Sequence, residues 1–233
     1  MEVDHTLPIR RDHFDGDGAA RGTARMEAFA DAVFAIAFTL PVLEIKMPHP
    51  GPEFGADLVR LWPSYLGYVI ASTVIGLYWA LHHFAGAIYR TTGHWLNLAT
   101  VLFLAAIGFV AFPARGFAEN IADPVTREPA ARYLAVALAF TAVTWLIKWA
   151  VARRTGHVDA RLDLDYVRGL DRKYAVSTAL MVAAAGLSFV NWPAGLALSA
   201  AVTLYYFLPM ATPVYRTEAP AVEGEEMTVA PSG

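Results

Sequence analysis

One aspartate lies several residues inside a long apolar stretch, where a charged side chain needs a reason. Residues 25 to 45 read RMEAFADAVFAIAFTLPVLEI, and most of this stretch could cross a membrane. An ionisable side chain in a spanning helix costs about 2.5–3.5 kcal/mol at the bilayer centre and less toward the end of the helix. Asp31 is therefore expected to contact a polar partner inside the protein or to take part in moving ions or protons.

Several polar side chains elsewhere are expected at a similar depth and could be that partner. Arg25 precedes Asp31 by a turn and a half, a second apolar stretch carries WALHH, and a third begins HWLNL. The candidates are Arg25, Trp79, His82, His83 and Asn97. Two chemistries stay open, namely a polar cluster that ties three helices together and a proton relay from Asp31 through His82 or His83.

Metal and enzyme chemistry are both disfavoured. The chain has no cysteine, neither histidine belongs to an HExxH motif, and no carboxylate stands at a familiar ligand spacing from them. The apolar stretches hold no GxSG motif and no pair of catalytic aspartates. We expect a protein without metal or cofactor that is not an enzyme, and that takes neither a nucleic acid nor a soluble substrate.

The composition and the segments predict an all-α membrane protein. Of 233 residues, 56% are hydrophobic and only 17% are charged, whereas soluble domains carry about 25% charged residues. A spanning helix needs about 20 mostly apolar residues. Six stretches qualify, at residues 26–45, 64–88, 95–114, 132–151, 174–190 and 194–214.

The lysine and arginine residues predict the orientation. With a cytoplasmic N-terminus, most of the 18 basic residues fall in cytoplasmic segments, as the positive-inside rule requires. Both termini are then cytoplasmic, Lys148 is expected to extend to the cytoplasmic surface, and residues 153–173 are expected to form a short helix on it. The polar residues 1–24, which are not a cleavable signal peptide, and the acidic residues 216–233 are expected to be disordered, around a six-helix transmembrane domain at 25–215.

The first apolar helix carries a seam of large side chains. Phe29, Val33, Ile36, Leu40 and Leu43 are spaced 4, 3, 4 and 3 residues apart and share one side of the helix. The seam either packs on another helix of the same subunit or faces an axis shared by several copies. The sequence shows no internal repeat, so a permeation path is more easily formed between copies than within one chain.

At these residues the sequence resembles the transmembrane protein 175 channels in their six-helix prokaryotic form. The family motif of arginine, three residues and phenylalanine-serine-aspartate corresponds here to Arg25, Phe29, Ala30 and Asp31, followed by AVFAIAFTL. WALHH and LNL also look similar. Two positions depart from the pattern, because Ala30 replaces the serine and Pro41 interrupts the outer half of the helix.

The resemblance implies a potassium-permeable cation channel in the cell's inner (plasma) membrane. Four copies would place their first helices around a central pore, in contact with lipid on the outside. By position, the constriction would be Ile36, with Leu40 and Leu43 on successive turns outward and Thr39 implicated in ion preference. Arg25, Phe29 and Asp31, with Trp79, His82 or His83, and Asn97, would form the network behind the pore. A proton-permeable channel or proton-coupled carrier that uses Asp31 and His82 or His83 remains the alternative.

Overall fold

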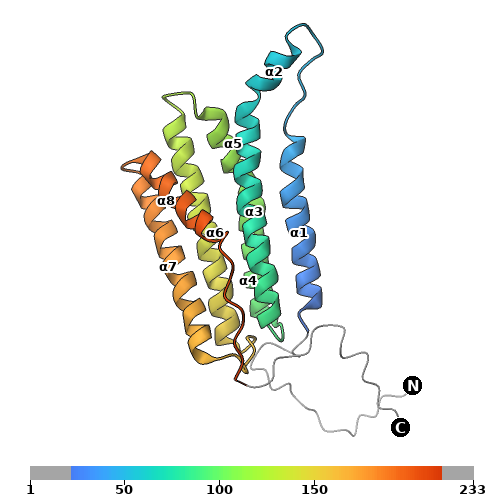
Figure 1. Ribbon diagram of the computed structural model, residues 1–233, viewed down its shortest axis with the longest axis vertical. Coiled ribbons are helices and arrows are strands. Elements are labelled where there is room, and N and C mark those ends of the chain that lie inside the picture. The colour runs from blue at the N-terminus through green and yellow to red at the C-terminus, as the bar shows by residue number, and fades with distance from the viewer. Residues whose placement is uncertain (1–21, 217–233) are drawn as a thin grey trace, which may run out of the picture.

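The structure is a computed structural model that describes residues 22–216, and within them the chain is a bundle of helices (Figure 1). The helices are α1 (Ala24–Leu43), α2 (Phe54–Arg60), α3 (Trp62–Ile88), α4 (His94–Phe109), α5 (Ala111–Asn120), α6 (Arg127–Arg154), α7 (Leu164–Ser188) and α8 (Trp192–Tyr205). The predicted all-α class is therefore confirmed. Nearly all of the predicted arm 1–24 and tail 216–233 lies outside the described residues.

The long helices run alternately up and down, which places the two ends of the described chain at the same end of the bundle (Figure 1). Helix α1 packs on α3 and α4, while α6 contacts α4, α5, α7 and α8. Helices α7 and α8 pack on each other at the edge farthest from α1 (Figure 1). One flank of the bundle is therefore α1 and the opposite flank is the α7–α8 pair.

Four of the predicted spans are long and apolar enough to cross a membrane by length and composition, and they lie at 24–43, 62–88, 94–120 and 127–154. The third joins α4 and α5, which are separated only by Val110. The chain is thus a multi-pass membrane protein. A short helix, α2, additionally occupies the link between the first two spans, where no helix was expected.

The fifth and sixth predicted stretches have different bounds in the structure. Helix α7 begins at Leu164, ten residues before the predicted start at Tyr174, because Asp163 caps it and accepts hydrogen bonds from the backbone N–H groups of Asp165 and Tyr166. Helix α8 ends at Tyr205 rather than Val214. Pro209 and Pro213 lie in the non-helical segment that follows, where helical backbone is disfavoured before a proline.

The separate surface helix predicted within residues 153–173 is wrong. Leu162, Val167 and Leu170, whose spacing suits a helix on the membrane surface, are only 2%, 3% and 5% exposed and join the hydrophobic core. The last two belong to the first turns of α7. The charged residues around them made this stretch resemble an interfacial helix, although its apolar side chains face the core.

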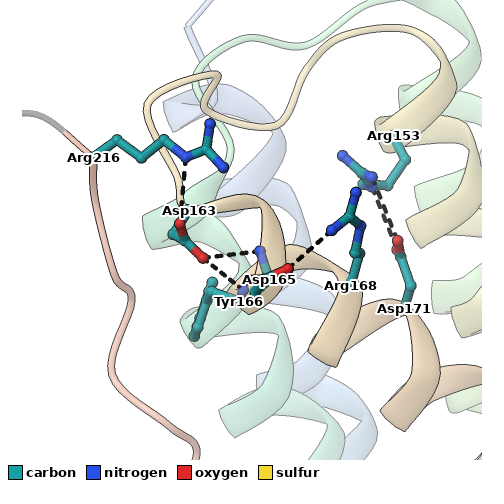
Figure 2. Close-up of polar contacts among 7 residues, drawn as sticks. All are labelled: Arg153, Asp163, Asp165, Tyr166, Arg168, Asp171 and Arg216. Carbon is teal, nitrogen blue, oxygen red and sulfur yellow. Dashed lines mark hydrogen bonds and ion pairs between the residues drawn. The ribbon is translucent and has the colours of Figure 1, made fainter.

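The end of the bundle that carries both chain ends is held together by loop pairing and ion pairs. Tyr89 and Val158 form an isolated β-bridge, as do Leu162 and Tyr215. Ion pairs join Arg216 to Asp163, Arg168 to Asp165 and Arg153 to Asp171 (Figure 2). The segment after α8 is thus fixed beside the start of α7.

Candidate pore helix and interhelical polar cluster

Asp31 contacts the second long helix through a tryptophan. The indole Nε1 of Trp79 on α3 donates a hydrogen bond of 3.0 Å to Asp31 Oδ1. The His83 ring stacks on the Trp79 ring, with 5.8 Å between centroids. Among the described residues Asp31 forms no ion pair with Arg25, whose side chain is exposed. The structure therefore brings Asp31, Trp79 and His83 together at the α1–α3 boundary.

The two adjacent histidines lie in different surroundings. His82 is 2% exposed and points into the bundle, whereas His83 is exposed. The His82 ring packs 5.7 Å from Phe34 of α1 and its Nδ1 lies 2.5 Å from Lys148 Nζ on α6. A lysine ammonium can only donate, so His82 accepts through Nδ1 and carries its proton on Nε2.

The expectation that Lys148 extends to the cytoplasmic surface is wrong, because its side chain is fully buried. Its Nζ lies 4.8 Å from the ring centroid of Trp145, 5.4 Å from that of Tyr89 and 5.6 Å from that of Phe103. Ring faces attract a cation within about 6 Å. Three rings and one imidazole thus replace the water that an extended lysine would have reached.

A glutamate that was not singled out from the sequence belongs to the same cluster. Glu27 on α1 lies within electrostatic range of Lys148. Its Oε1 is buried without a hydrogen-bond partner among the described residues, as is Nε2 of His82. Gly86 on α3 makes room for this carboxylate, because a Cβ there would lie 3.1 Å from Glu27 Oε1. Glu27, His82 and Lys148 therefore form a polar cluster that links α1, α3 and α6.

Two sequence signals pointed toward this cluster. Lys148 interrupts the apolar run TAVTWLIKWAVA, and an ionisable residue inside a spanning helix is by default a candidate for a specific role. Gly86 stands one turn after His82. The spacing could not show which of the two histidines turns inward, because both stand near the edge of the helix face that packs on α1.

The seam of α1 is open in a single chain. Phe29, Ile36, Leu40 and Leu43 are 53%, 56%, 51% and 74% exposed. Met26, Ala30 and Phe34, which are centred about 100° around the same helix from the seam, are buried against the rest of the bundle. Within the described chain the seam is therefore largely uncovered, although Val33 is partly buried and Ile36 and Leu40 border a hollow that Gly108 and Ala111 also line.

Three further predicted positions have their own surroundings. The Thr39 hydroxyl donates to the carbonyl of Ala35 at 2.7 Å, while Asn97 is exposed and forms no side-chain hydrogen bond within residues 22–216. Ala30, which stands where the motif has serine, is completely buried. Pro41 lies in the last turn of α1, which ends two residues later, so its missing N–H affects only the end of the helix.

The described residues contain no group of three His, Asp or Glu side chains placed to hold a metal ion. The charged and polar groups instead contact one another or aromatic rings. Their contacts position α1, α3 and α6 relative to one another, and the apolar seam of α1 stays largely uncovered.

Comparison with known proteins identifies the family. The profile described as endosomal/lysosomal potassium channel TMEM175 matches residues 25–111. A potassium channel of Streptomyces collinus is 35% identical over 209 residues, which cover 85% of this chain and 98% of that protein. An endosomal/lysosomal proton channel TMEM175 of Gallus gallus is 35% identical over 94 residues, covering 36% of this chain and 19% of that protein.

A solved structure agrees with these relatives. The crystal structure of a lysosomal potassium-selective channel TMEM175 homologue from Chamaesiphon minutus superposes with a TM-score of 0.67 at 30% identity, covering 80% of this chain and 96% of that one. The family is one of ion channels rather than enzymes. The chain belongs to the TMEM175 family.

Proposed function

We propose that this protein is a potassium-permeable cation channel of the cell's inner membrane. Four copies assemble around an axis, α1 of each copy lines the pore, and both chain ends are cytoplasmic. The names of the Streptomyces and Chamaesiphon relatives support potassium as the permeant ion. All six long segments cross the membrane, the last as the short α8 followed by the extended segment that returns along α7.

The observation that carries this proposal is the exposed seam of α1. The exposed side of α1 could meet lipid, which accepts any apolar side chain, but large side chains spaced 4, 3, 4 and 3 residues apart are typical of a helix that packs against other helices. The buried face shows which side holds the helix in its own subunit. The open seam is then free to meet its copies on a common axis.

An apolar ring at Ile36 explains how such a pore closes. Four isoleucine side chains on the axis leave no oxygen ligand for an ion that sheds its water. Hydrophobic constrictions of this kind gate by dewetting. Thr39 lies beside the seam, and its hydroxyl, which already donates to the Ala35 carbonyl, keeps lone pairs that could face an ion.

The polar contacts behind α1 hold the pore helix at a fixed rotation. Asp31 fixes it to α3 through Trp79, while Glu27 and the His82–Lys148 pair fix its cytoplasmic half. On this proposal Asp31 is a positioning residue and not an ion ligand. Arg25, next to Phe29 at the cytoplasmic end of the seam, is left to act at the pore entrance.

Proton permeation is the second candidate, and the name of the Gallus gallus relative favours it. Direct contacts do not support a relay from Asp31 to His82 or His83, because His82 meets Lys148 and Trp79 lies between Asp31 and His83, bonded to the one and stacked on the other. Flux from liposomes that hold purified protein separates the candidates. We expect a potassium gradient to drive flux well above a sodium gradient, and a pH gradient alone to drive little. Flux that follows only the pH gradient would establish the proton channel instead.

A further inference from the structure

A groove opens on the flank of the bundle farthest from α1. It lies between α7, α8 and the segment that follows α8, and its volume is about 860 Å³, within the range of ligand pockets, about 300–1,000 Å³. We call it the α7–α8 groove. Its walls include Val176, Leu180, Leu198 and Ala201, and Lys173 lies midway along the α7 wall, which runs from Tyr166 to Leu180.

The groove changes character along its length. Lys173 directly precedes the apolar run 174–190 of α7, so it stands at the boundary between the charged end of the bundle and the hydrocarbon layer. Val176 and Leu180 follow on the next turns of the same helix. The groove is therefore basic at headgroup depth and apolar below it.

The two basic residues that line the groove, Arg172 and Lys173, are not neutralised by the protein. Their neighbours are paired, as Arg153 with Asp171 and Arg168 with Asp165 (Figure 2). Arg172 and Lys173, which both line the groove, form no ion pair among residues 22–216.

Lys173 is instead held by apolar groups. Its Nζ lies 5.1 Å and 5.0 Å from the ring centroids of Tyr205 and Tyr206, and 3.0 Å from Sδ of Met210. These contacts orient the ammonium group without cancelling its charge. A fixed, uncompensated cation beside an apolar trough is complementary to an anion that carries an acyl chain.

We propose that the α7–α8 groove binds an anionic phospholipid of the cytoplasmic leaflet, with the phosphate at Arg172 and Lys173 and an acyl chain along Val176 and Leu180. Basic pockets between spanning helices on the cytoplasmic side bind such headgroups. The inference rests on the proposed function for its orientation, because α1 at the pore axis leaves the α7–α8 flank to face lipid.

Native mass spectrometry of the detergent-purified full chain tests the proposal. The probes are dioleoyl phosphatidylglycerol and dioleoyl phosphatidylcholine, which share acyl chains and differ in charge. We expect wild type to retain phosphatidylglycerol preferentially. Arg172→Gln/Lys173→Gln should weaken this binding about tenfold or more. The matched control Arg154→Gln, at an exposed arginine on the same end but outside the groove, should leave it unchanged.

A second variant tests the acyl-chain part of the groove. Ala201 is exposed in the groove, so Ala201→Trp fills the trough without disturbing the core and should abolish retention of phosphatidylglycerol. Equal retention of the two lipids by wild type, or unchanged phosphatidylglycerol binding in either variant, would overturn the proposal. A disulfide-linked dimer formed on oxidation of Ala201→Cys would overturn it too, by showing that a second copy covers the groove.

The acidic residues 217–233 offer one more occupant. Phosphatidylglycerol binding that appears only after their deletion would assign the groove to them and overturn the proposal.

Potassium flux in pure phosphatidylcholine liposomes reports on the channel alone. The Arg172→Gln/Lys173→Gln variant should conduct there like wild type, so failure of the lipid site and failure of the channel are separate results.

Discussion

Removal of the buried lysine should expose how the polar cluster is balanced. Lys148→Met keeps the length of the side chain and removes its charge. The change leaves Nδ1 of His82 without its donor, which costs about 1–3 kcal/mol for a buried acceptor. It also removes the cation that attracts the half-buried Glu27 carboxylate. Because Glu27 and Lys148 form no ion pair among the described residues, this second effect is smaller than that of a contact pair, and we expect a net loss of about 3 kcal/mol, at the upper end of the range for the His82 acceptor.

A second change should restore part of that loss. Glu27→Gln/Lys148→Met removes both charges, so the His82 acceptor is the only group that newly loses a partner, and the double variant should lose about 1–3 kcal/mol. The double variant is thus expected to be more stable than the Lys148→Met single variant. A simple loss of packing at Lys148 would give the opposite order.

Unfolding in mixed micelles of dodecyl maltoside and sodium dodecyl sulfate, followed by tryptophan fluorescence, measures these differences. Lys46→Met, at an exposed lysine in the link after α1, is the matched control and should change stability by less than about 0.5 kcal/mol. The reasoning is refuted if Lys148→Met is as stable as this control, or if the double variant is the least stable of the set.

Three further predictions concern other contacts. Asp31→Ala removes the acceptor of the Trp79 indole and should reduce the yield of folded tetramer in size-exclusion chromatography. Because both side chains are exposed within one chain, we expect a loss of about 0.5–1.5 kcal/mol, the net contribution of one hydrogen bond. Asp31→Asn keeps an acceptor and should have a smaller effect, whereas loss of proton flux in both variants, with folding intact, would favour the relay. Gly195→Ala should destabilise the folded chain by about 1–3 kcal/mol, because the added Cβ would lie 2.7 Å from the Ala184 carbonyl oxygen and the Ser188 Cα. Gly108→Ala is the control, because a Cβ there meets nothing within 4 Å. Equal melting temperatures of the two variants would contradict this prediction. Hydrogen bonds from the backbone N–H groups of Tyr166 and Asp165 hold the pKa of Asp163 below its usual value of 3.8. The stabilisation from this cap is therefore present above that value and is lost as pH falls through the lower pKa of the folded state. Asp163→Ala should be less stable than wild type at neutral pH and lose less stability in acid, and equal pH dependence of the two stabilities would refute the cap.

The apolar pattern predicted the long helices well because a spanning helix needs only length and hydrophobicity. Phe29, Ile36 and Leu40 were placed on one side of α1 by spacing alone, and the structure leaves that side open. Their position on a pore axis stays a prediction, since it depends on other copies of the chain. The end of α8 and the start of α7 were missed, because a proline-containing return segment and the Asp163 cap decide them locally.

The buried cluster could not be derived from one helix at a time. Lys148 stands about 9 Å along the axis from Arg154, close enough to the helix end for an extended side chain to reach water. Its burial depends on the rings of Tyr89 and Phe103, which come from other segments. The same holds for His82 and His83, because the depth of each depends on how α3 turns against α1 and α6.

Potassium and sodium flux through Ile36→Asn tests the central claim most directly. The variant is compared in liposomes with Val42→Asn, which changes another exposed residue of α1 about 120° around the helix. If α1 lines the pore with its seam, Ile36→Asn holds water at the constriction, raises basal flux and reduces discrimination between potassium and sodium, while Val42→Asn conducts like wild type. If Ile36→Asn conducts like wild type at matched tetramer yield and Val42→Asn changes the selectivity, the seam does not face the pore.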